Sequence, residues 1–199
     1  MAIPIVSGEG GAAISRRNFG ETIADLSNPY RYDYWYTPRY AGFAFNPMDI
    51  PVDGHMLLSL IAPRPLLQIV GINDTWSDPK GEWLAAKAAE PVYELYGLKG
   101  METADFPRPD TLILNDMGFF MHNAGHGVFQ EDYQAMTDFM KRGCANPGRS
   151  AHQMARQADD AVMHTREYLA RLFNISDPMR IAFMANATYG LNMAIHGVL

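Results

Sequence analysis

Three polar residues in separate turn-forming loops could together move a proton. They are Glu9 in SGEGG, Asp74 in GINDTW and His126 in NAGHG. A neutral imidazole can accept the proton of a hydroxyl group, and a neighbouring carboxylate fixes its tautomer and stabilises the imidazolium that forms. Each loop follows a segment that we expect to be a strand, and open α/β sheets place their sites where parallel strands end. The pattern therefore predicts an acid–base site at that edge.

Each of these residues also has an ordinary structural explanation when it is taken alone. Glu9 could bond to the backbone amides of its own loop, and Asp74 could form an Asx turn. His126 could be a solvated loop histidine. His122 is a second candidate base, but the apolar residues before it indicate packing. The occurrence of all three residues, in this order and at strand ends, is what favours a site.

The elements that must position these residues alternate between strand and helix. Apolar runs at 2–7, 66–71 and 111–114 predict buried strands. We expect one helix after the Gly8–Gly11 loop, then helices over 54–62 capped by Asp53, 79–96 kinked or split by Pro91, and 130–141. The aromatic, irregular residues 28–51 predict a long surface excursion over a pocket. The alternation indicates an α/β protein with a parallel sheet covered on both faces.

The last quarter of the chain has a different pattern. After a linker-like GCANPGRS, we expect a helix over 152–173, a strand over 180–184 and a helix over 187–197. Backbone N–H groups at that last helix start, with the hydroxyl of Thr188, would suit a phosphate, and the small Ala187 would allow close approach. Taken alone, this is also the appearance of an ordinary strand, turn and helix.

Composition excludes several classes of partner. The net charge of −6 and the absence of a basic stripe argue against nucleic acid or an anionic membrane as a partner. Cys144 is the single cysteine, so an intramolecular disulfide is excluded, and a structural role suits it better than a nucleophilic one. No apolar run is long enough to span a bilayer, and MAIPIVSGEG does not read as a signal peptide. We expect no metal site, and the localisation is open.

The segments IPIVSGEGGAAISRRNFGET, IAPRPLLQIVGINDTWSDPKGEW and HNAGHG carry a specific resemblance. Residues 2–128 resemble the C-terminal half of a glucuronoyl esterase of carbohydrate esterase family 15, an α/β-hydrolase family whose acid precedes its histidine. The resemblance implies that His126 is the catalytic base and that the acid is Asp74 or Glu9. It also implies that Trp76 and Glu21 contact the uronate sugar, so the expected partner is a glucuronate-type carbohydrate ester.

The resemblance does not extend to the nucleophile. The family carries it in a G-C-S-R-x-G-K elbow about two dozen residues before the Glu9 loop, and no serine of this chain lies in a G-x-S-x-G context. We therefore expect the chain alone to be inactive. The alternatives are a hydrolase that receives its nucleophile strand from a separate polypeptide, and a non-catalytic carbohydrate-binding remnant. In the second case Trp76 and the aromatic residues of 30–45 would stack on sugars, although aromatic runs are more often simply packed.

A second resemblance covers residues 133–199 through YQAMTDFM, ANPGRSAH, ARLFN and FMANATYGLN. These segments resemble the N-terminal part of a cysteine desulfurase or class V aminotransferase, which uses pyridoxal phosphate (PLP). The resemblance implies that Ala187 and Thr188 hold the cofactor phosphate, while Tyr189 stands where the family usually has Glu. None of the four lysines follows this turn, so we expect no cofactor to bind stably.

The sequence thus predicts a chimeric chain of class α/β. Residues 1–130 form an incomplete α/β-hydrolase parallel sheet with flanking helices, and residues 131–199 form a helix–strand–helix piece of a PLP-transferase fold. The seam lies within 126–136, where one helix satisfies both patterns. Because both halves lack strands of their parent folds, we also expect self-association through exposed sheet edges.

Overall fold

The computed structural model describes residues 1–32, 34–143 and 153–183. The chain divides into two compact units, Met1–Gly143 and Cys144–Leu199, and each is described by itself. The sequence predicts that the esterase-like part gives way to the aminotransferase-like part within 126–136. The boundary between the two structural units lies later, between Gly143 and Cys144. Helix α5 (Gln130–Gly143) lies in the first unit.

The first unit is built on two parallel strands. Strand β1 (Leu66–Gly71) pairs with β2 (Met117–His122), with Leu66 opposite Met117 and Gly71 opposite His122. Every residue of both strands is buried, as expected for parallel strands covered on two faces. The predicted strand 66–71 is therefore confirmed.

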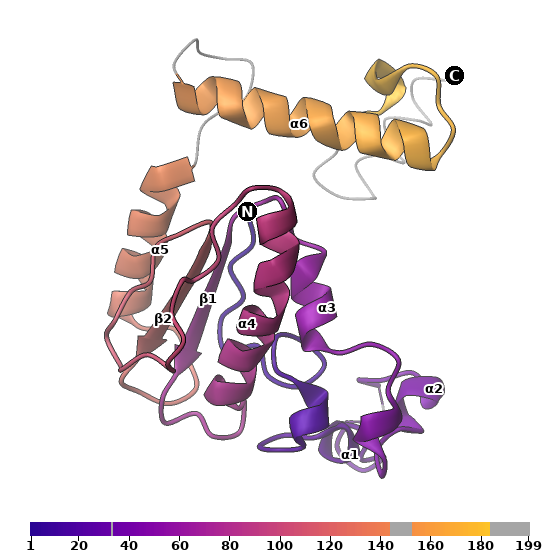
Figure 1. Cartoon of the computed structure of the whole chain (residues 1–199). Helices are drawn as coiled ribbons and strands as arrows, with labels where there is room; N and C mark the ends of the chain where they lie inside the picture. The colour runs from indigo at the N-terminus through magenta and orange to yellow at the C-terminus, as the bar shows by residue number, and fades with distance from the viewer. Residues whose placement is uncertain (33, 144–152, 184–199) are drawn as a thin grey trace, which may run out of the picture. The chain divides into compact units, whose positions relative to one another are not determined.

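Helices cover both faces of this sheet (Figure 1). The strand residues alternate between the two faces. Leu66, Val70 and Phe119 pack with helix α4 (Pro79–Leu95) in one core cluster. Leu67 and Ile69 pack with α5 in the other. The period-two alternation of side chains places the two cores on opposite faces, which confirms the predicted covered sheet.

The N-terminal segment lies beside β1 in the parallel direction. The N–H of Ala2 donates to Pro65 O at 2.9 Å and the N–H of Val6 donates to Ile69 O at 2.8 Å. The segment makes only two isolated bridges, so the predicted strand 2–7 is not a regular strand. Pro4 has no N–H to donate, and Val6 has a φ of 41°, which ends the extended conformation.

The predicted strand at 111–114 is wrong. The third apolar strand is β2, in residues that the sequence pattern assigned to a loop, and Ile113 forms only an isolated antiparallel bridge with Phe119. Residues 117–122 are completely buried, whereas 112–114 are only partly buried. Burial between α4 and α5 therefore decides which of the two neighbouring segments becomes the strand.

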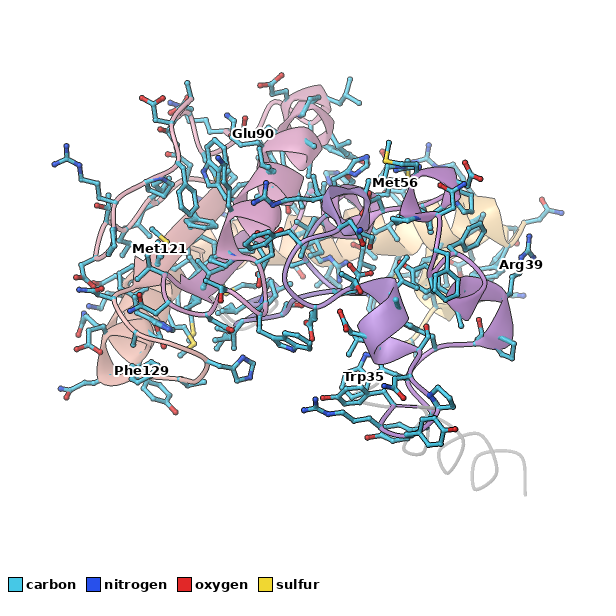
Figure 2. All side chains as sticks on the ribbon, turned by 90° about the horizontal axis from the view of Figure 1, so that it is seen from below. Trp35, Arg39, Met56, Glu90, Met121 and Phe129 are labelled. Carbon is cyan, nitrogen blue, oxygen red and sulfur yellow. The ribbon has the colours of Figure 1, made fainter. Side chains whose placement is uncertain are left out.

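The remaining elements of this unit are short. They are the 3-10 turn η1 (Ser15–Arg17), where a helix was expected, α1 (Ile23–Leu26), α2 (Pro38–Ala41), η2 (Pro47–Asp49) and α3 (Gly54–Ser59). Asp53 caps α3 as predicted, since its Oδ1 accepts from the N–H of Gly54 at 2.7 Å. Of the two alternatives predicted for Pro91, a kink or a split, the split is wrong, because helix α4 continues through Pro91 as one helix. Figure 2 shows Trp35 and Arg39 of the excursion 28–51 on the side of this unit opposite Phe129.

The second unit contains helix α6 (Gln153–Leu172) and the 3-10 turn η3 (Pro178–Arg180). The helix confirms the prediction for 152–173. The predicted strand 180–184 is wrong over its described part, because Arg180 ends η3 and residues 181–183 form no regular structure. The predicted helix 187–197 lies outside the described residues. Within the described parts of the chain, none of the helices is long and apolar enough to cross a membrane.

One buried carboxyl group fixes the N-terminal segment to α4. Glu82 is fully buried, and its Oε1 accepts from the N–H of Gly8 at 3.1 Å while its Oε2 faces Gln68 Nε2 at 3.5 Å. Burial raises the pKa of Glu82 from 4.5 to about 8, although hydrogen bonds from the Gly8 and Ser7 backbone lower it. The contact holds the loop that carries Glu9 against the sheet.

The free edge of the N-terminal segment generates the first prediction. Backbone groups of Ala2, Pro4 and Val6 form the hydrogen bonds to the β1 side. The N–H and C=O groups of Ile3 and Ile5, which lie between them, take part in none of the described backbone hydrogen bonds. We expect the 199-residue chain to self-associate through this edge. Ile3→Pro removes one outward donor and should lower the associated fraction in sedimentation velocity, whereas Ile3→Val should not. A monomer at all concentrations would contradict this.

The raised pKa of Glu82 generates a second prediction, about stability. The unfolded carboxyl loses its proton near pH 4.5 and the folded one near pH 8, so this group makes stability fall as pH rises between those values. Glu82→Gln keeps an oxygen acceptor for Gly8 and removes the ionisation. Urea unfolding should therefore show a smaller loss of stability from about pH 5 to pH 8 in this variant than in the wild type. Glu94→Gln, at an exposed position of α4, should leave the loss unchanged, and an equal loss in both variants would contradict the prediction.

Candidate active site

A histidine–carboxylate pair stands at the carboxyl end of the sheet. The Nδ1 atom of His126 lies 2.8 Å from Oδ2 of Asp74, although 52 residues separate the two in the sequence. Asp74 follows β1 and His126 follows β2, so the pairing of these parallel strands brings both loops to one edge. The expectation that a carboxylate lies within hydrogen-bonding distance of His126 is met.

The pair is asymmetric in its exposure to solvent. The side chain of Asp74 is 4% exposed and that of His126 is 66% exposed. A carboxylate only accepts, so it favours the tautomer with the proton on Nδ1, and this leaves the lone pair of Nε2 able to take a proton. The arrangement is that of a general base whose inner nitrogen is fixed by a buried acid.

Two local bonds hold Asp74 in place. Its N–H donates to Gly71 O at 3.0 Å, and its Oδ1 accepts from the N–H of Ser77 at 3.3 Å. The Asx-turn interpretation and the acid interpretation of Asp74 are therefore compatible, because Oδ1 serves the turn and Oδ2 serves His126. Ser77, which the sequence did not single out, also places its Oγ 3.4 Å from Nδ1 of His126. No sequence signal marked Ser77, since its role comes from the fold of its loop.

Glu9 lies in a separate buried cluster. Its Oε1 accepts from the hydroxyl of Ser15 at 2.6 Å, and Tyr40 OH lies 3.3 Å from the same hydroxyl. Burial raises the pKa of Glu9 to about 7, while the hydrogen bond from Ser15 lowers it. Among the described contacts none joins Glu9 directly to His126. The geometry thus favours Asp74 over Glu9 as the partner of the imidazole.

Glu21 connects the Glu9 loop with the loop of Asp74. Its Oε1 accepts from the N–H of Glu9 at 2.9 Å, and its own N–H donates to Trp76 O at 2.6 Å. Burial raises the pKa of Glu21, while hydrogen bonds from the Glu9 backbone and the Trp76 side chain lower it. Its carboxyl group is close enough to Asp74 and His126 to interact electrostatically with both side chains.

The close approach of the two loops depends on a glycine. Gly20 has a φ of 73°, and a Cβ there would lie 2.3 Å from Trp76 O. Trp76 is 44% exposed, and its neighbour Ser77 lies against His126. The structure therefore places both predicted sugar-contacting residues, Glu21 and Trp76, next to the His126–Asp74 pair.

The alternative base, His122, is wholly buried. Its Nδ1 lies 2.8 Å from Oδ1 of Asp132, and its Nε2 lies 3.0 Å from Gly125 O. Its ring also meets Phe129 edge-on, with centroids 4.7 Å apart. Both nitrogens are occupied and neither reaches solvent, so His122 is unsuited to accept a proton from a substrate.

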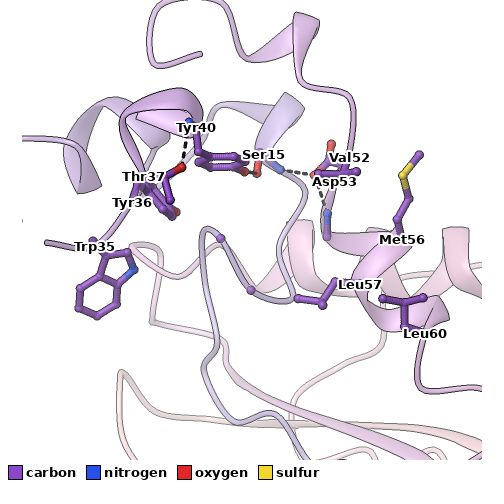
Figure 3. A pocket seen from close by; sticks show the side chains of 13 residues that line it. Ser15, Trp35, Tyr36, Thr37, Tyr40, Val52, Asp53, Met56, Leu57 and Leu60 are labelled. Carbon is purple, nitrogen blue, oxygen red and sulfur yellow. Dashed lines mark hydrogen bonds between the residues drawn. The ribbon is translucent and has the colours of Figure 1, made fainter. Parts of the chain in front are cut away.

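A hollow of about 600 Å³ lies between the aromatic excursion and α3 (Figure 3). Tyr36 and Tyr40 form its inner wall, with ring centroids 4.7 Å apart. Elsewhere in the excursion Tyr30 and Phe45 are almost fully exposed. The aromatic run thus contains both packed rings and rings accessible to a sugar, and the prediction of a pocket under 28–51 is met.

The predicted cofactor residues Ala187 and Thr188 lie outside the described residues. Within the described ranges, no group of three His, Cys, Asp or Glu side chains could hold a metal ion.

Comparison with known families divides the chain in two. Residues 1–97 match the family described as glucuronyl esterase of fungi, and residues 119–199 match aminotransferase class V. The second match begins at residue 119, before residue 133, where the sequence resemblance placed its start. It includes the last four residues of β2 and all of α5, which lie in the first unit. The aminotransferase match therefore extends into the first structural unit.

Individual relatives agree with the first match. A carbohydrate esterase from an unknown prokaryotic organism is 35% identical over 139 residues, which are 70% of this chain and 32% of that protein. A 4-O-methyl-glucuronoyl methylesterase of Phanerochaete carnosa is 28% identical over 103 residues, 49% of this chain and 25% of that protein. The chain thus spans about a third or less of the relatives it matches.

Solved structures give the same assignment. A glucuronoyl esterase from Teredinibacter turnerae aligns with a TM-score of 0.65 and 36% identity, over 70% of this chain and 34% of that one. A promiscuous esterase of the same family from a marine bacterial metagenome gives a TM-score of 0.67 at 35% identity, with the same coverage. The chain therefore combines a segment of the glucuronoyl esterase lineage, with an α/β-hydrolase type of fold, and a segment that matches the class V aminotransferase family.

Proposed function

We propose that residues 1–128 provide the acid–base half of a site that hydrolyses glucuronate-type carbohydrate esters. The observation that carries this proposal is the 2.8 Å contact between His126 Nδ1 and a buried Asp74 carboxylate, which leaves the exposed ring otherwise available. The relatives named as glucuronoyl methylesterases support the substrate class.

In this proposal His126 acts as the base of an acyl transfer. Its Nε2 removes the proton of the attacking hydroxyl as that oxygen bonds to the ester carbonyl carbon, and Asp74 stabilises the imidazolium. The imidazolium then returns the proton to the leaving alcohol. Water repeats the sequence and releases the free uronate. Trp76 and Glu21, which flank the pair, would contact the uronate sugar.

The attacking hydroxyl is not among the serines that the structure describes near His126. Ser77 faces Nδ1, the nitrogen that Asp74 occupies, and Ser77 is buried. Ser15 is bonded to Glu9. The resemblance to glucuronoyl esterases places the nucleophile before the Glu9 loop, so the proposal assigns it to a segment other than these 199 residues.

This proposal generates a test with two parts. The 199-residue chain alone should not hydrolyse a methyl glucuronate ester, because covalent and oxyanion catalysis both need the nucleophile segment. A fusion placing the chain behind the preceding part of the Teredinibacter turnerae esterase should hydrolyse it. In that fusion His126→Ala should lower kcat/KM about 10²- to 10⁴-fold.

The matched control is His164→Ala, which removes an exposed histidine of α6 and should leave the rate unchanged. A folded, active fusion that is indifferent to His126→Ala would overturn the assignment of the base. Turnover by the chain alone that disappears in His126→Ala would instead reveal a nucleophile within these residues. An inactive fusion that still binds glucuronate would favour the carbohydrate-binding remnant.

Residues 119–199 match the aminotransferase class V family, whose resemblance implies PLP as the cofactor. Covalent attachment of PLP needs a suitable lysine. The lysines are Lys80, Lys87, Lys99 and Lys141, and residues 142–199 contain none. Lys87, Lys99 and Lys141 are each paired with a nearby carboxylate. The residues present therefore do not fit a covalently attached PLP.

Incubation with PLP followed by borohydride should accordingly give no single modified lysine. Mass spectrometry of the digested protein measures this directly, and scattered low-level modification of surface lysines is the expected background. Stoichiometric labelling of one lysine, with a distinct absorbance band before reduction, would contradict the prediction.

A further inference from the structure

The loop that carries His126 has little rigidity of its own. It runs through Gly125 and Gly127, with a φ of 150° at Gly127, and a Cβ added at Gly125 would meet nothing within 4 Å. Glycine residues admit a wide range of backbone conformations, so the direction of the His126 side chain must be fixed by contacts from outside the loop.

Two hydrogen bonds provide that constraint, and both act on carbonyl groups just before His126. The N–H of Asn73 donates to Ala124 O at 3.0 Å, and Nε2 of His122 lies 3.0 Å from Gly125 O. The carbonyl of Gly125 shares a rigid peptide plane with the N–H of His126. Holding this oxygen therefore fixes the backbone orientation at which His126 begins.

His122 is itself held by a buried carboxylate. Its Nδ1 lies 2.8 Å from Oδ1 of Asp132, which is completely buried, and the other oxygen of Asp132 accepts from the N–H of Phe129 at 2.7 Å. The carbonyl of Gly125 only accepts, so Nε2 of His122 must carry a proton. A carboxylate on Nδ1 fixes the ring so that Nε2 points at the loop.

The space for this contact depends on the end of β1. A Cβ at Gly71 would lie 2.6 Å from His122 Nε2 and 2.5 Å from Gly125 O. Gly71 stands opposite His122 in the strand register. The bare glycine, the buried ring and the loop carbonyl therefore form one packed unit at the sheet edge.

We propose that His122 and Asp132 are positioning residues, which orient His126 toward Asp74 through the hydrogen bond from His122 Nε2 to the Gly125 carbonyl. The importance of this orientation for catalysis rests on the proposed function. The orientation itself is a property of the folded chain and is measurable without any substrate.

Ring-nitrogen NMR of the 15N-histidine-labelled chain provides the test, with the His126 signal assigned from its loss in His126→Gln. Two substitutions separate the two bonds of His122. Gln places an amide nitrogen near the position of Nε2 and so retains a donor for Gly125. Asn places one near the position of Nδ1 and retains only the contact with Asp132.

We expect the proton signal of His126 Nδ1–H, bonded to Asp74, to persist in His122→Gln and to be lost in His122→Asn. Asp132→Asn should weaken it, while Asp138→Asn, a partly exposed position on the same helix, should leave it unchanged. A purely structural role would lower the melting temperature of both His122 variants without this difference. Folded variants that all keep the wild-type signal would overturn the proposal.

The wild-type spectrum decides the matter if the variants do not fold. His122 Nε2 must be protonated and its proton must exchange slowly with water, and an unprotonated Nε2 would overturn the proposal. Because none of these measurements involves ester hydrolysis, an inactive fusion enzyme with an ordered His126 would contradict the proposed function alone.

Discussion

The parallel pairing of β1 with β2 is the constraint on which the rest of the first unit depends. Both strands are buried on two faces, so a shift of one residue would move apolar side chains of each strand from one core to the other. The register that places Gly71 opposite His122 also fixes where the two following loops begin. Asp74 and His126 meet because they lie three and four residues beyond these paired positions.

Buried polar groups then convert this framework into a specific site. Glu82 holds the Glu9 loop from α4, and Asp132 holds His122 from α5. The first contact links a helix with a loop at the sheet edge, and the second links a helix with the last residue of β2. Unpaired buried polar groups are costly, so these bonds favour one arrangement of the loops over other compact arrangements. The helices α4 and α5 therefore contribute side chains that hold the loops of the site, as well as covering the sheet.

Residues 98–118 separate the two family matches, and the second match begins inside the first structural unit. Residues 119–143 lie within the aminotransferase match, and buried side chains of this range complete the two cores of the first unit: Phe119 and Met121 in one, and Phe120, Ala135 and Phe139 in the other. An amphipathic helix with an apolar stripe can satisfy two different parent folds, since each asks only for apolar residues at helical spacing. This gives a physical reason why such a joint can be accommodated.

The sequence by itself determined the elements with strong periodicity and the residues with distinctive chemistry. The runs 66–71 and 130–141 predict β1 and α5 because burial on both faces and helical amphipathicity leave clear patterns. It also singled out Asp74 and His126 as candidate site residues, which the fold brings into contact, and it added Trp76 and Glu21 as candidates through a family resemblance. It placed the third strand at 111–114, because two neighbouring apolar segments compete and local pattern does not rank them. Only the space between α4 and α5 selects 117–122.

The tertiary structure alone decided the partners of each polar group. The sequence left Asp74 and Glu9 as alternative acids, since a carboxylate in a loop has no intrinsic direction. The fold directs Asp74 to His126 and Glu9 to Ser15. The fold also buries His122, which the sequence offered as an alternative base, and places it in contact with Asp132 and with the Gly125 carbonyl of the histidine loop. Hydrogen bonds between residues far apart in the chain depend on strand register and helix packing, and these are properties of the whole fold.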